Sequence, residues 1–191
     1  MRCICSRGLA VGLLFLLVLS AFPASSTVLA KQSDELLARR SSLIVLGNAT
    51  EAKSEWIDRR LVTLVKIEVT ETLKGEGGGS VTVIVPGGID TSRPMPIAQT
   101  VDGAPSFQIG EQVLLFLKPV AEMPGRFLLV GSSQGKLTIR QGAKGLLAHR
   151  NLGGVRLYDG REIAPGVSRT VPLDELRRIV KQVVGESRQN S

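Results

Sequence analysis

The sequence predicts a mainly β protein: a small closed or nearly closed antiparallel barrel with a short helix before it and an amphipathic helix after it. Apolar residues recur at every second position, or in short runs, through most of the chain, and turns rich in Gly and Pro separate these segments. Helical spacing of apolar residues occurs near residues 33–40 and 173–184. Short strands joined by turns, with a helix at each end, are typical of a closed sheet.

Residues 1–30 have the pattern of an export signal. Arg2 and Arg7 precede an apolar run over residues 9–19, and small residues lead to a polar segment. The run is shorter than the roughly 20 residues that a membrane-spanning helix needs. We therefore expect cleavage between Ala30 and Lys31, and an exported protein that is secreted or held in the periplasm or cell envelope. The alternative is an uncleaved anchor, in which case this segment alone contacts the membrane.

The cysteines limit the chemistry of the remaining chain. Both of them, Cys3 and Cys5, lie within the predicted signal. We therefore expect neither a disulfide nor a thiolate nucleophile nor a cysteine metal ligand in the exported protein. About 160 residues are enough for one domain with its own core. We predict a single domain over residues 31–185 and a flexible tail over residues 186–191.

The chain is basic, with 24 Lys and Arg against 17 Asp and Glu and a formal net charge of +7. Its basic residues are scattered, and the chain holds only one Trp, one Tyr and five Phe. Nucleic-acid interfaces combine basic side chains with aromatic ones on which bases stack. We therefore interpret the charge as a solvated surface without specific nucleic-acid binding, with weak binding of polyanions as the alternative.

The elements are predicted in chain order from local patterns. Ser33 caps a short helix that ends at Arg40, with acidic residues in its first turn and arginines in its last. Residues 61–73 alternate between apolar and polar and form a hairpin with residues 81–85. The last helix ends near Gly185. The strands that we expect cover residues 43–47, 61–73, 81–85, 113–117, 127–130, 136–140 and 155–158.

The order of residues 43–47, 65–75, 81–88 and 109–117 resembles the barrel of netrin modules and tissue inhibitors of metalloproteinases. It is still more similar to cysteine-free bacterial exported proteins of unknown role. The resemblance covers about residues 36–140 and implies a five-stranded barrel of the oligonucleotide/oligosaccharide-binding (OB) type. The animal inhibitors use an amino-terminal cysteine, which this chain lacks. The resemblance therefore implies a fold and no site residues.

Catalytic and metal-binding patterns are weak. His149 is the only histidine and lies in residues 146–150, which we expect to be an irregular surface segment. One histidine without cysteines does not match a zinc site or a catalytic triad. Asp90, Asp102 and Glu111 could bind calcium, and Asp102 with Glu111 could serve a hydrolase. However, their spacing matches no calcium loop, and acids near turns usually cap backbone amides. We predict no enzyme activity, no cofactor and no metal.

Residues 87–110 show neither helical nor strand periodicity and form the best candidate for a binding site. Three prolines stiffen this long loop, and Arg93, Met95 and Ile97 offer one charged and two apolar contacts. The two apolar side chains could instead pack back onto the barrel. Trp56 either packs over a barrel end or anchors a partner. We predict a non-catalytic module that binds an unidentified extracytoplasmic protein through this loop. The alternative is a basic envelope protein that binds an anionic glycan or another polyanion.

Overall fold

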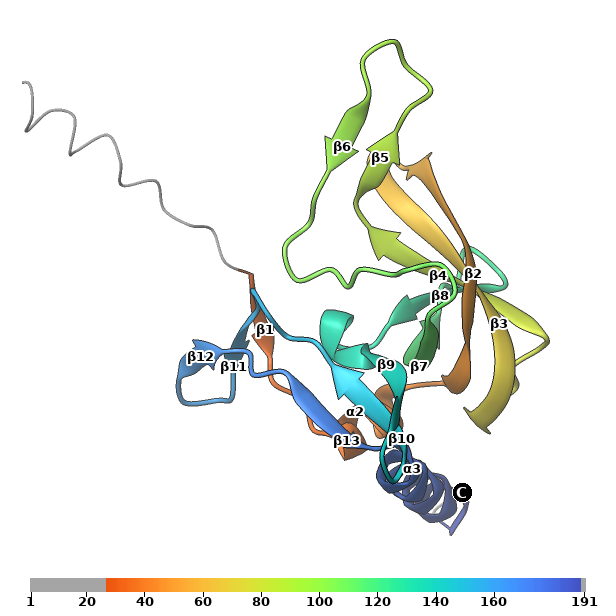
Figure 1. Ribbon diagram of the computed structural model, residues 1–191, viewed down its shortest axis with the longest axis vertical. Coiled ribbons are helices and arrows are strands. Elements are labelled where there is room, and N and C mark those ends of the chain that lie inside the picture. Colours follow the sequence, from red (N-terminus) through yellow and green to blue (C-terminus); the bar gives the residue numbers. More distant parts are fainter. Residues whose placement is uncertain (1–26, 190–191) are drawn as a thin grey trace, which may run out of the picture.

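The computed structural model describes residues 27–189 and is mainly β, with a short helix near its start and a longer one at its end (Figure 1). This confirms the predicted fold class. Residues 1–26 of the predicted signal lie outside the described chain. In chain order the elements are β1 (Val28–Ala30), α2 (Asp34–Arg40), β2 (Leu43–Ile57), β3 (Arg60–Lys74), β4 (Ser80–Pro86), β5 (Gly88–Asp90), β6 (Ile97–Gln99), β7 (Gln112–Pro119), β8 (Arg126–Leu129), the 3-10 helix η1 (Ser132–Gly135), β9 (Lys136–Gly142), β10 (Gly145–Arg150), β11 (Arg156–Tyr158), β12 (Ile163–Pro165), β13 (Arg169–Pro172) and α3 (Leu173–Gln189).

Five strands close into a ring in the order β7-β2-β3-β4-β8, because β8 pairs with both β4 and β7. The pairings are antiparallel except for β4 with β8, which is parallel. One edge of β7 is divided between two partners: its first half pairs with β9 and its last residues with β8. Strands β9, β10 and β13 therefore continue the sheet outward from the ring.

Strands β2 and β3 are 15 residues each and extend well beyond the ring. They meet in a two-residue turn in which Asp58 and Arg59 both have positive φ values, 46° and 63°. Positive φ at both positions is the property of a type I′ turn, whose twist matches that of a hairpin. The last part of β2 pairs only with β3, and most of its side chains are exposed or half-buried. For this reason the sequence shows a strand only over residues 43–47.

Strand β7 is buried on both faces, as its continuous apolar run predicts. Val113, Leu115 and Leu117 face the interior of the ring. Leu114 and Phe116 face the opposite way. The interior of the ring is filled by the buried side chains of Leu43, Val45, Ala49, Val65, Ile67, Val81, Val83, Val85, Val113, Leu115 and Leu117.

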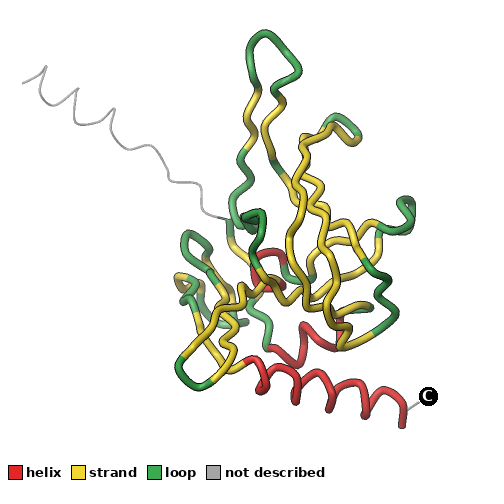
Figure 2. Tube along the Cα trace, turned by 45° about the vertical axis from the view of Figure 1, so that its right-hand side comes forward, coloured by secondary structure: helices red, strands yellow, loops and turns green. Residues whose placement is uncertain are grey.

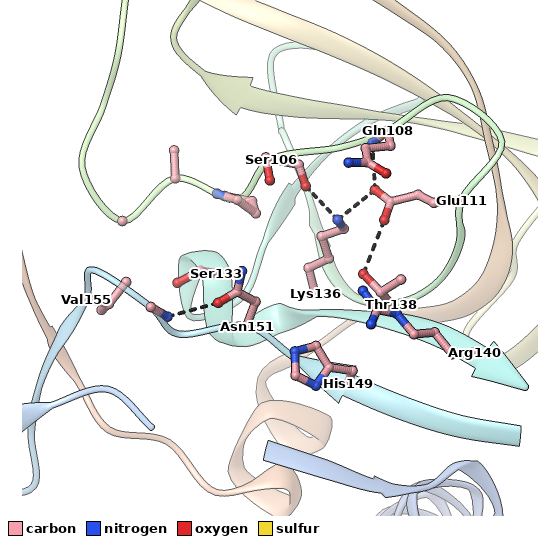
Figure 3. A pocket seen from close by; sticks show the side chains of 14 residues that line it. Ser106, Gln108, Glu111, Ser133, Lys136, Thr138, Arg140, His149, Asn151 and Val155 are labelled. Atoms are coloured by element: carbon pink, nitrogen blue, oxygen red, sulfur yellow. Dashed lines mark hydrogen bonds and ion pairs between the residues drawn. The ribbon is translucent and has the colours of Figure 1, made fainter. Parts of the chain in front are cut away.

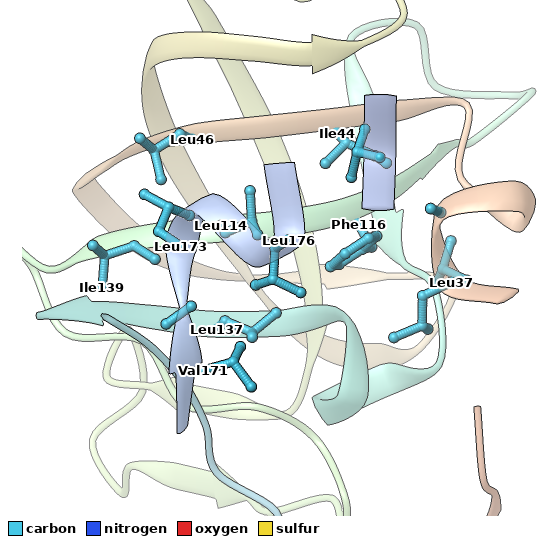
Figure 4. Packing of buried hydrophobic residues seen from close by; sticks show 14 of the residues in the cluster. Leu37, Ile44, Leu46, Leu114, Phe116, Leu137, Ile139, Val171, Leu173 and Leu176 are labelled. Atoms are coloured by element: carbon cyan, nitrogen blue, oxygen red, sulfur yellow. The ribbon is translucent and has the colours of Figure 1, made fainter. Parts of the chain in front are cut away.

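A second core lies between the helices α2 and α3 and the part of the sheet that β9, β10 and β13 form (Figure 4). Leu173, Leu176, Val180 and Val183 supply one buried face of α3, at the spacing that an amphipathic helix requires. They pack with Phe116, which is fully buried, and with side chains of β2, β9, β10, β13 and α2. No helix within residues 27–189 is long and apolar enough to cross a membrane.

The short strand β1 attaches the start of the described chain to a separate three-stranded sheet, in the order β1-β11-β12. It pairs in parallel with β11, and Leu29 packs against a small buried cluster of Leu152, Val155 and Leu157. Gln134 is 2% exposed, and its side-chain amide donates to the carbonyl of Ala30 at 2.9 Å. The last residues of the predicted signal, residues 28–30, are therefore a structural strand.

Candidate functional site

The predicted binding loop contains a hairpin that projects from one end of the molecule (Figures 1 and 2). Strands β5 and β6 pair antiparallel, with Asp90 opposite Ile97. Residues 91–96, which include Pro94 and Pro96, connect them. The sequence indicated no strand here because three residues are too few to show a period of two. We call residues 88–99 the β5–β6 hairpin.

A polar cluster at the base of the hairpin joins it to the end of β2. Trp56 Nε1 donates to Asp90 Oδ2 at 2.8 Å, and the Nε of Arg93 lies 3.3 Å from the same oxygen. The guanidinium of Arg93 is 5.8 Å from the centroid of the Trp56 ring, within the range of a cation–π contact. Ser92 donates to Asp90 Oδ1 from both its backbone N–H and its hydroxyl, at 3.0 and 2.6 Å.

These contacts stabilise the charged form of Asp90. The hydrogen bond from the Ser92 side chain, followed by that from Trp56, lowers the pKa of Asp90 from 3.8 to about 2. The side chain of Asp90 is only 10% exposed, although it lies at the surface. Each oxygen of the carboxylate thus has two partners, and these contacts hold the base of the hairpin against β2.

The four predicted contact residues have different surroundings. Met95 at the tip is 79% exposed, and Trp56 is 43% exposed. Trp56 lies within β2, not in a polar connection before the next strand. Ile97 is half-buried. Ile89, which the sequence did not single out, is 59% exposed on the same hairpin. Three large apolar side chains are thus presented to solvent around the Trp56, Asp90 and Arg93 cluster.

A polar cavity of about 400 Å³ lies between residues 103–111 and strands β9 and β10 (Figure 3). Its floor is the polar face of β9 and β10, on which Thr138 lies directly opposite His149. Lys136 and Arg140 lie two residues on either side of Thr138 and therefore share its face. We call this space the β9–β10 cavity. It is lined by Gly103, Ala104, Pro105, Ser106, Gln108, Glu111, Ser133, Lys136, Thr138, Arg140, His149, Asn151, Gly153 and Val155.

An ion pair between Lys136 and Glu111 ties the roof of the cavity to its floor. Lys136 Nζ lies 2.6 Å from Glu111 Oε1, and the two side chains are 10% and 11% exposed. The ammonium also donates to the carbonyl of Ser106 at 2.5 Å and lies 4.4 Å from the ring centroid of Phe107. Glu111 accepts further hydrogen bonds from the backbone of Gln108 and the hydroxyl of Thr138, at 2.9 and 3.2 Å.

These contacts do not form the acid pair that a hydrolase would need. Both oxygens of Glu111 already have donors, and Asp102 is not among the residues that line the cavity. Over residues 27–189, no group of three or more His, Cys, Asp or Glu side chains is arranged to hold a metal ion.

His149 lies in a strand and not in an irregular surface segment. Strand β10 pairs with β9 on one side and β13 on the other, and His149 is half-buried with its Nδ1 2.9 Å from Thr170 Oγ1. The sequence analysis therefore missed His149, Arg140 and Asn151 as cavity residues. The alternation of residues 136–140 did indicate a polar face on that strand, but not the segment that covers it.

Another cavity, of about 510 Å³, lies at the foot of the β5–β6 hairpin. Apolar side chains of the ring, including Val65 and Val85, line it together with the hydroxyls of Ser54 and Thr63. Gly88 approaches these hydroxyls so closely that an added Cβ would lie 2.5 Å from Ser54 Oγ.

The chain matches no known family model and no curated protein.

Proposed function

We propose that the protein is an exported, non-catalytic binding module that contacts another extracytoplasmic protein through the β5–β6 hairpin. The observation that carries this proposal is the combination of a projecting hairpin with three exposed apolar side chains around a fixed polar base. Met95, Ile89 and Trp56 are 79%, 59% and 43% exposed. Clusters of exposed apolar and aromatic groups on a rigid support are typical of protein-binding surfaces.

The rigid base favours binding because less freedom is lost on contact. Ser54 Oγ accepts from the backbone N–H of Ile89 at 3.0 Å, and Asp90 joins the hairpin to Trp56. Ordering a free side chain on binding costs about 0.5–1.5 kcal/mol, and a preformed hairpin avoids part of this cost. Arg93 is paired with Asp90 beside the apolar groups. The partner that fits is a protein with an apolar cleft.

The same proposal includes the export of the module and the assignment of its ring to the OB-like barrels. The basic, apolar and small-residue regions of residues 1–30 support an export signal. The ring order, with a three-strand meander and one parallel closing pair, supports an OB-like barrel and the resemblance to netrin-type modules. In OB-like barrels, ligands bind to one face of the sheet and to the loops beside it.

The test compares three forms of the full-length protein in capture from the native extracytoplasmic fraction. Met95→Ser removes the most exposed apolar side chain of the hairpin. Val167→Ser is the matched control, because Val167 is 77% exposed in a different loop. A partner that is retained by the wild type and by Val167→Ser, but lost with Met95→Ser, supports the proposal. Equal capture by all three forms contradicts it.

The salt dependence of capture separates the protein partner from the alternative, an envelope protein that binds an anionic glycan or another polyanion. An apolar contact persists at high ionic strength. Polyanion binding weakens steeply because it depends on screened charges and released counterions. Loss of all capture at high salt would favour the alternative.

A further inference from the structure

We propose that the β9–β10 cavity is a separate ligand site that binds a small sugar acid, held by its carboxylate at Arg140 and by its hydroxyl groups along β10. The proposal takes its ligand class from the glycan-binding alternative above and does not depend on the β5–β6 hairpin. The volume of about 400 Å³ falls within the roughly 300–1,000 Å³ of small-molecule sites.

The charges of the cavity leave one positive group uncompensated. Lys136 and Glu111 neutralise each other. Arg140 lines the cavity, and in the described chain its guanidinium has no ion pair and no hydrogen bond. A guanidinium presents parallel donors that match the two oxygens of a carboxylate. An anionic group is therefore the complement of this end of the cavity.

Hydrogen-bonding groups without an ion pair continue from Arg140 along the cavity. His149 uses Nδ1 toward Thr170, which leaves Nε2 without a partner among residues 27–189. Asn151 uses its oxygen to accept from Gly153 N and Ser168 Oγ, at 3.0 and 3.3 Å, which leaves its amide NH₂ without one. Spaced hydrogen-bonding groups beyond the guanidinium match a sugar acid better than a compact inorganic anion.

Ser133 adds an independent indication of a ligand. It lines the cavity, it is 6% exposed, and its buried hydroxyl has no hydrogen-bond partner in the described chain. A buried hydroxyl without a partner is unfavourable, and such groups in folded proteins call for a specific explanation. The hydroxyl oxygen itself is enclosed in the described chain, and a rotation of the Ser133 side chain toward the cavity would let a ligand hydroxyl satisfy it.

The roof of the cavity favours a single sugar unit or a chain end over the middle of a polymer. Ser132 Oγ donates to the carbonyl of Gly103 at 2.7 Å, and Lys136 holds the carbonyl of Ser106. The first bond fastens the roof to η1, and the second, drawn in Figure 3, fastens it to β9. A polymer passing through would have to break them, whereas a terminal unit could enter from the open side.

The test is a titration of the full-length protein with D-glucuronate, followed by NMR chemical shifts or calorimetry at constant ionic strength. D-glucose is the neutral probe of the same ring size, and sulfate is the probe for a simple anion. We expect saturable binding of glucuronate, with glucose and sulfate each weaker by about tenfold or more, because each of them lacks one of the two recognised features.

Two variants locate the site. Arg140→Gln should weaken glucuronate binding by about tenfold or more, because a charged hydrogen-bonded pair is lost. Arg178→Gln is the matched control, since Arg178 is exposed on α3 and Gln and Arg have similar helix propensities. Ser133→Ala should weaken binding severalfold without lowering the melting temperature, because its hydroxyl has no partner to lose.

Each remaining outcome has a definite meaning. No saturable glucuronate binding, equal binding of sulfate, or equal losses in Arg140→Gln and Arg178→Gln would overturn the proposal. Met95→Ser should bind glucuronate as the wild type does. Failure of this site would therefore leave the hairpin proposal intact, and failure of the hairpin proposal would leave this one intact.

Discussion

The indole N–H of Trp56 donates a 2.8 Å hydrogen bond to the carboxylate of Asp90, across 34 positions in the sequence. This bond connects the solvent-exposed end of β2 to the first strand of the β5–β6 hairpin. The base of the hairpin is therefore held by a carboxylate that has three hydrogen-bond donors and a neighbouring arginine. Both the orientation of Trp56 and that of Arg93 follow from it.

Acid should break the contacts between Asp90 and Trp56 at the base of the hairpin. The pKa of Asp90 is lowered to about 2 from 3.8, so its stabilisation is fully present above the ordinary pKa and is lost as the pH falls through about 2. Trp56 is the only tryptophan and therefore reports on this step by fluorescence. We expect constant emission from neutral pH down to 3.8 and a change near pH 2.

Asp90→Asn should abolish this acid transition, because the amide cannot titrate. Asp159→Asn is the control: hydrogen bonds from the backbone of Glu162 and Arg161 lower the pKa of Asp159 as well, but it lies in the turn between β11 and β12. An unchanged transition in Asp90→Asn would assign the fluorescence change to another group.

Gly87 should be required where β4 leads into the hairpin. Its φ is +91°, and an added Cβ would lie 2.6 Å from the carbonyl oxygen of Gln99. We expect Gly87→Ala to lower the free energy of unfolding by roughly 1–3 kcal/mol, as measured by denaturant titration. Gly78→Ala is the control, because no heavy atom of residues 27–189 other than its own chain neighbours lies within 4 Å of its added Cβ. It should change stability by less than about 0.5 kcal/mol. Equal effects would show that Gly87 is not strained.

The buried ion pair between Asp34 and Arg150 should matter far more than an exposed one. Arg150 Nη2 lies 2.7 Å from Asp34 Oδ1, and the side chains are 8% and 5% exposed. Arg150→Met leaves a buried carboxylate whose other partner, Arg169, is largely exposed and 3.4 Å away. We expect a loss of about 3–5 kcal/mol in the free energy of unfolding.

The matched control for this pair is Arg39→Met, which breaks the surface ion pair of Arg39 with Glu186. Exposed pairs contribute about 0–1 kcal/mol because water screens them. Denaturant unfolding of both variants gives the comparison. A loss of less than about 1 kcal/mol for Arg150→Met would mean that Arg169 takes over the charge of Asp34.

The position of signal cleavage should affect stability. A chain that starts at Lys31, as the sequence predicts, lacks β1 and the packing of Leu29 against Leu157 and its neighbours. A chain that starts at Thr27 keeps both. We expect the shorter form to be less stable by about 1–2 kcal/mol, because full burial of a leucine side chain is worth about 1.5–3 kcal/mol and Leu29 is half-buried. Thermal unfolding of the two forms tests this, and equal melting temperatures would show that β1 is dispensable.

The surroundings of the proposed contact residues could be predicted only in part. The absence of core periodicity in residues 87–110 indicated a surface loop, but it left open whether Met95 is exposed or packs back onto the barrel. The bond from Trp56 to Asp90 could not be foreseen, because the two residues are far apart in the chain and their meeting depends on the extension of β2. The β9–β10 cavity could not be foreseen either, since its roof and floor come from separate segments.

The sequence by itself determined the mainly β class, the hairpin of β3 with β4, the burial of β7 on both faces and the amphipathic face of α3. These features depend on local alternation, on continuous apolar runs and on helical spacing, which are properties of a few neighbouring residues. The sequence also indicated the end of α3 at Gly185, whereas the helix continues to Gln189. An isolated glycine costs only about 1 kcal/mol in a helix, and the ion pair of Glu186 with Arg39 holds the turn beyond it.

Only the tertiary structure decided the length of β2, the hairpin of β5 with β6 and the strand identity of β10. The second half of β2 pairs only with β3 in the described chain and meets no core, so its side chains are exposed or half-buried and show no apolar alternation. Strands β5 and β6 are too short for a period, and β10 is fixed by its neighbours β9 and β13. In each case backbone hydrogen bonds to a neighbouring strand hold the segment, and these bonds leave no pattern in the side chains of the strand itself.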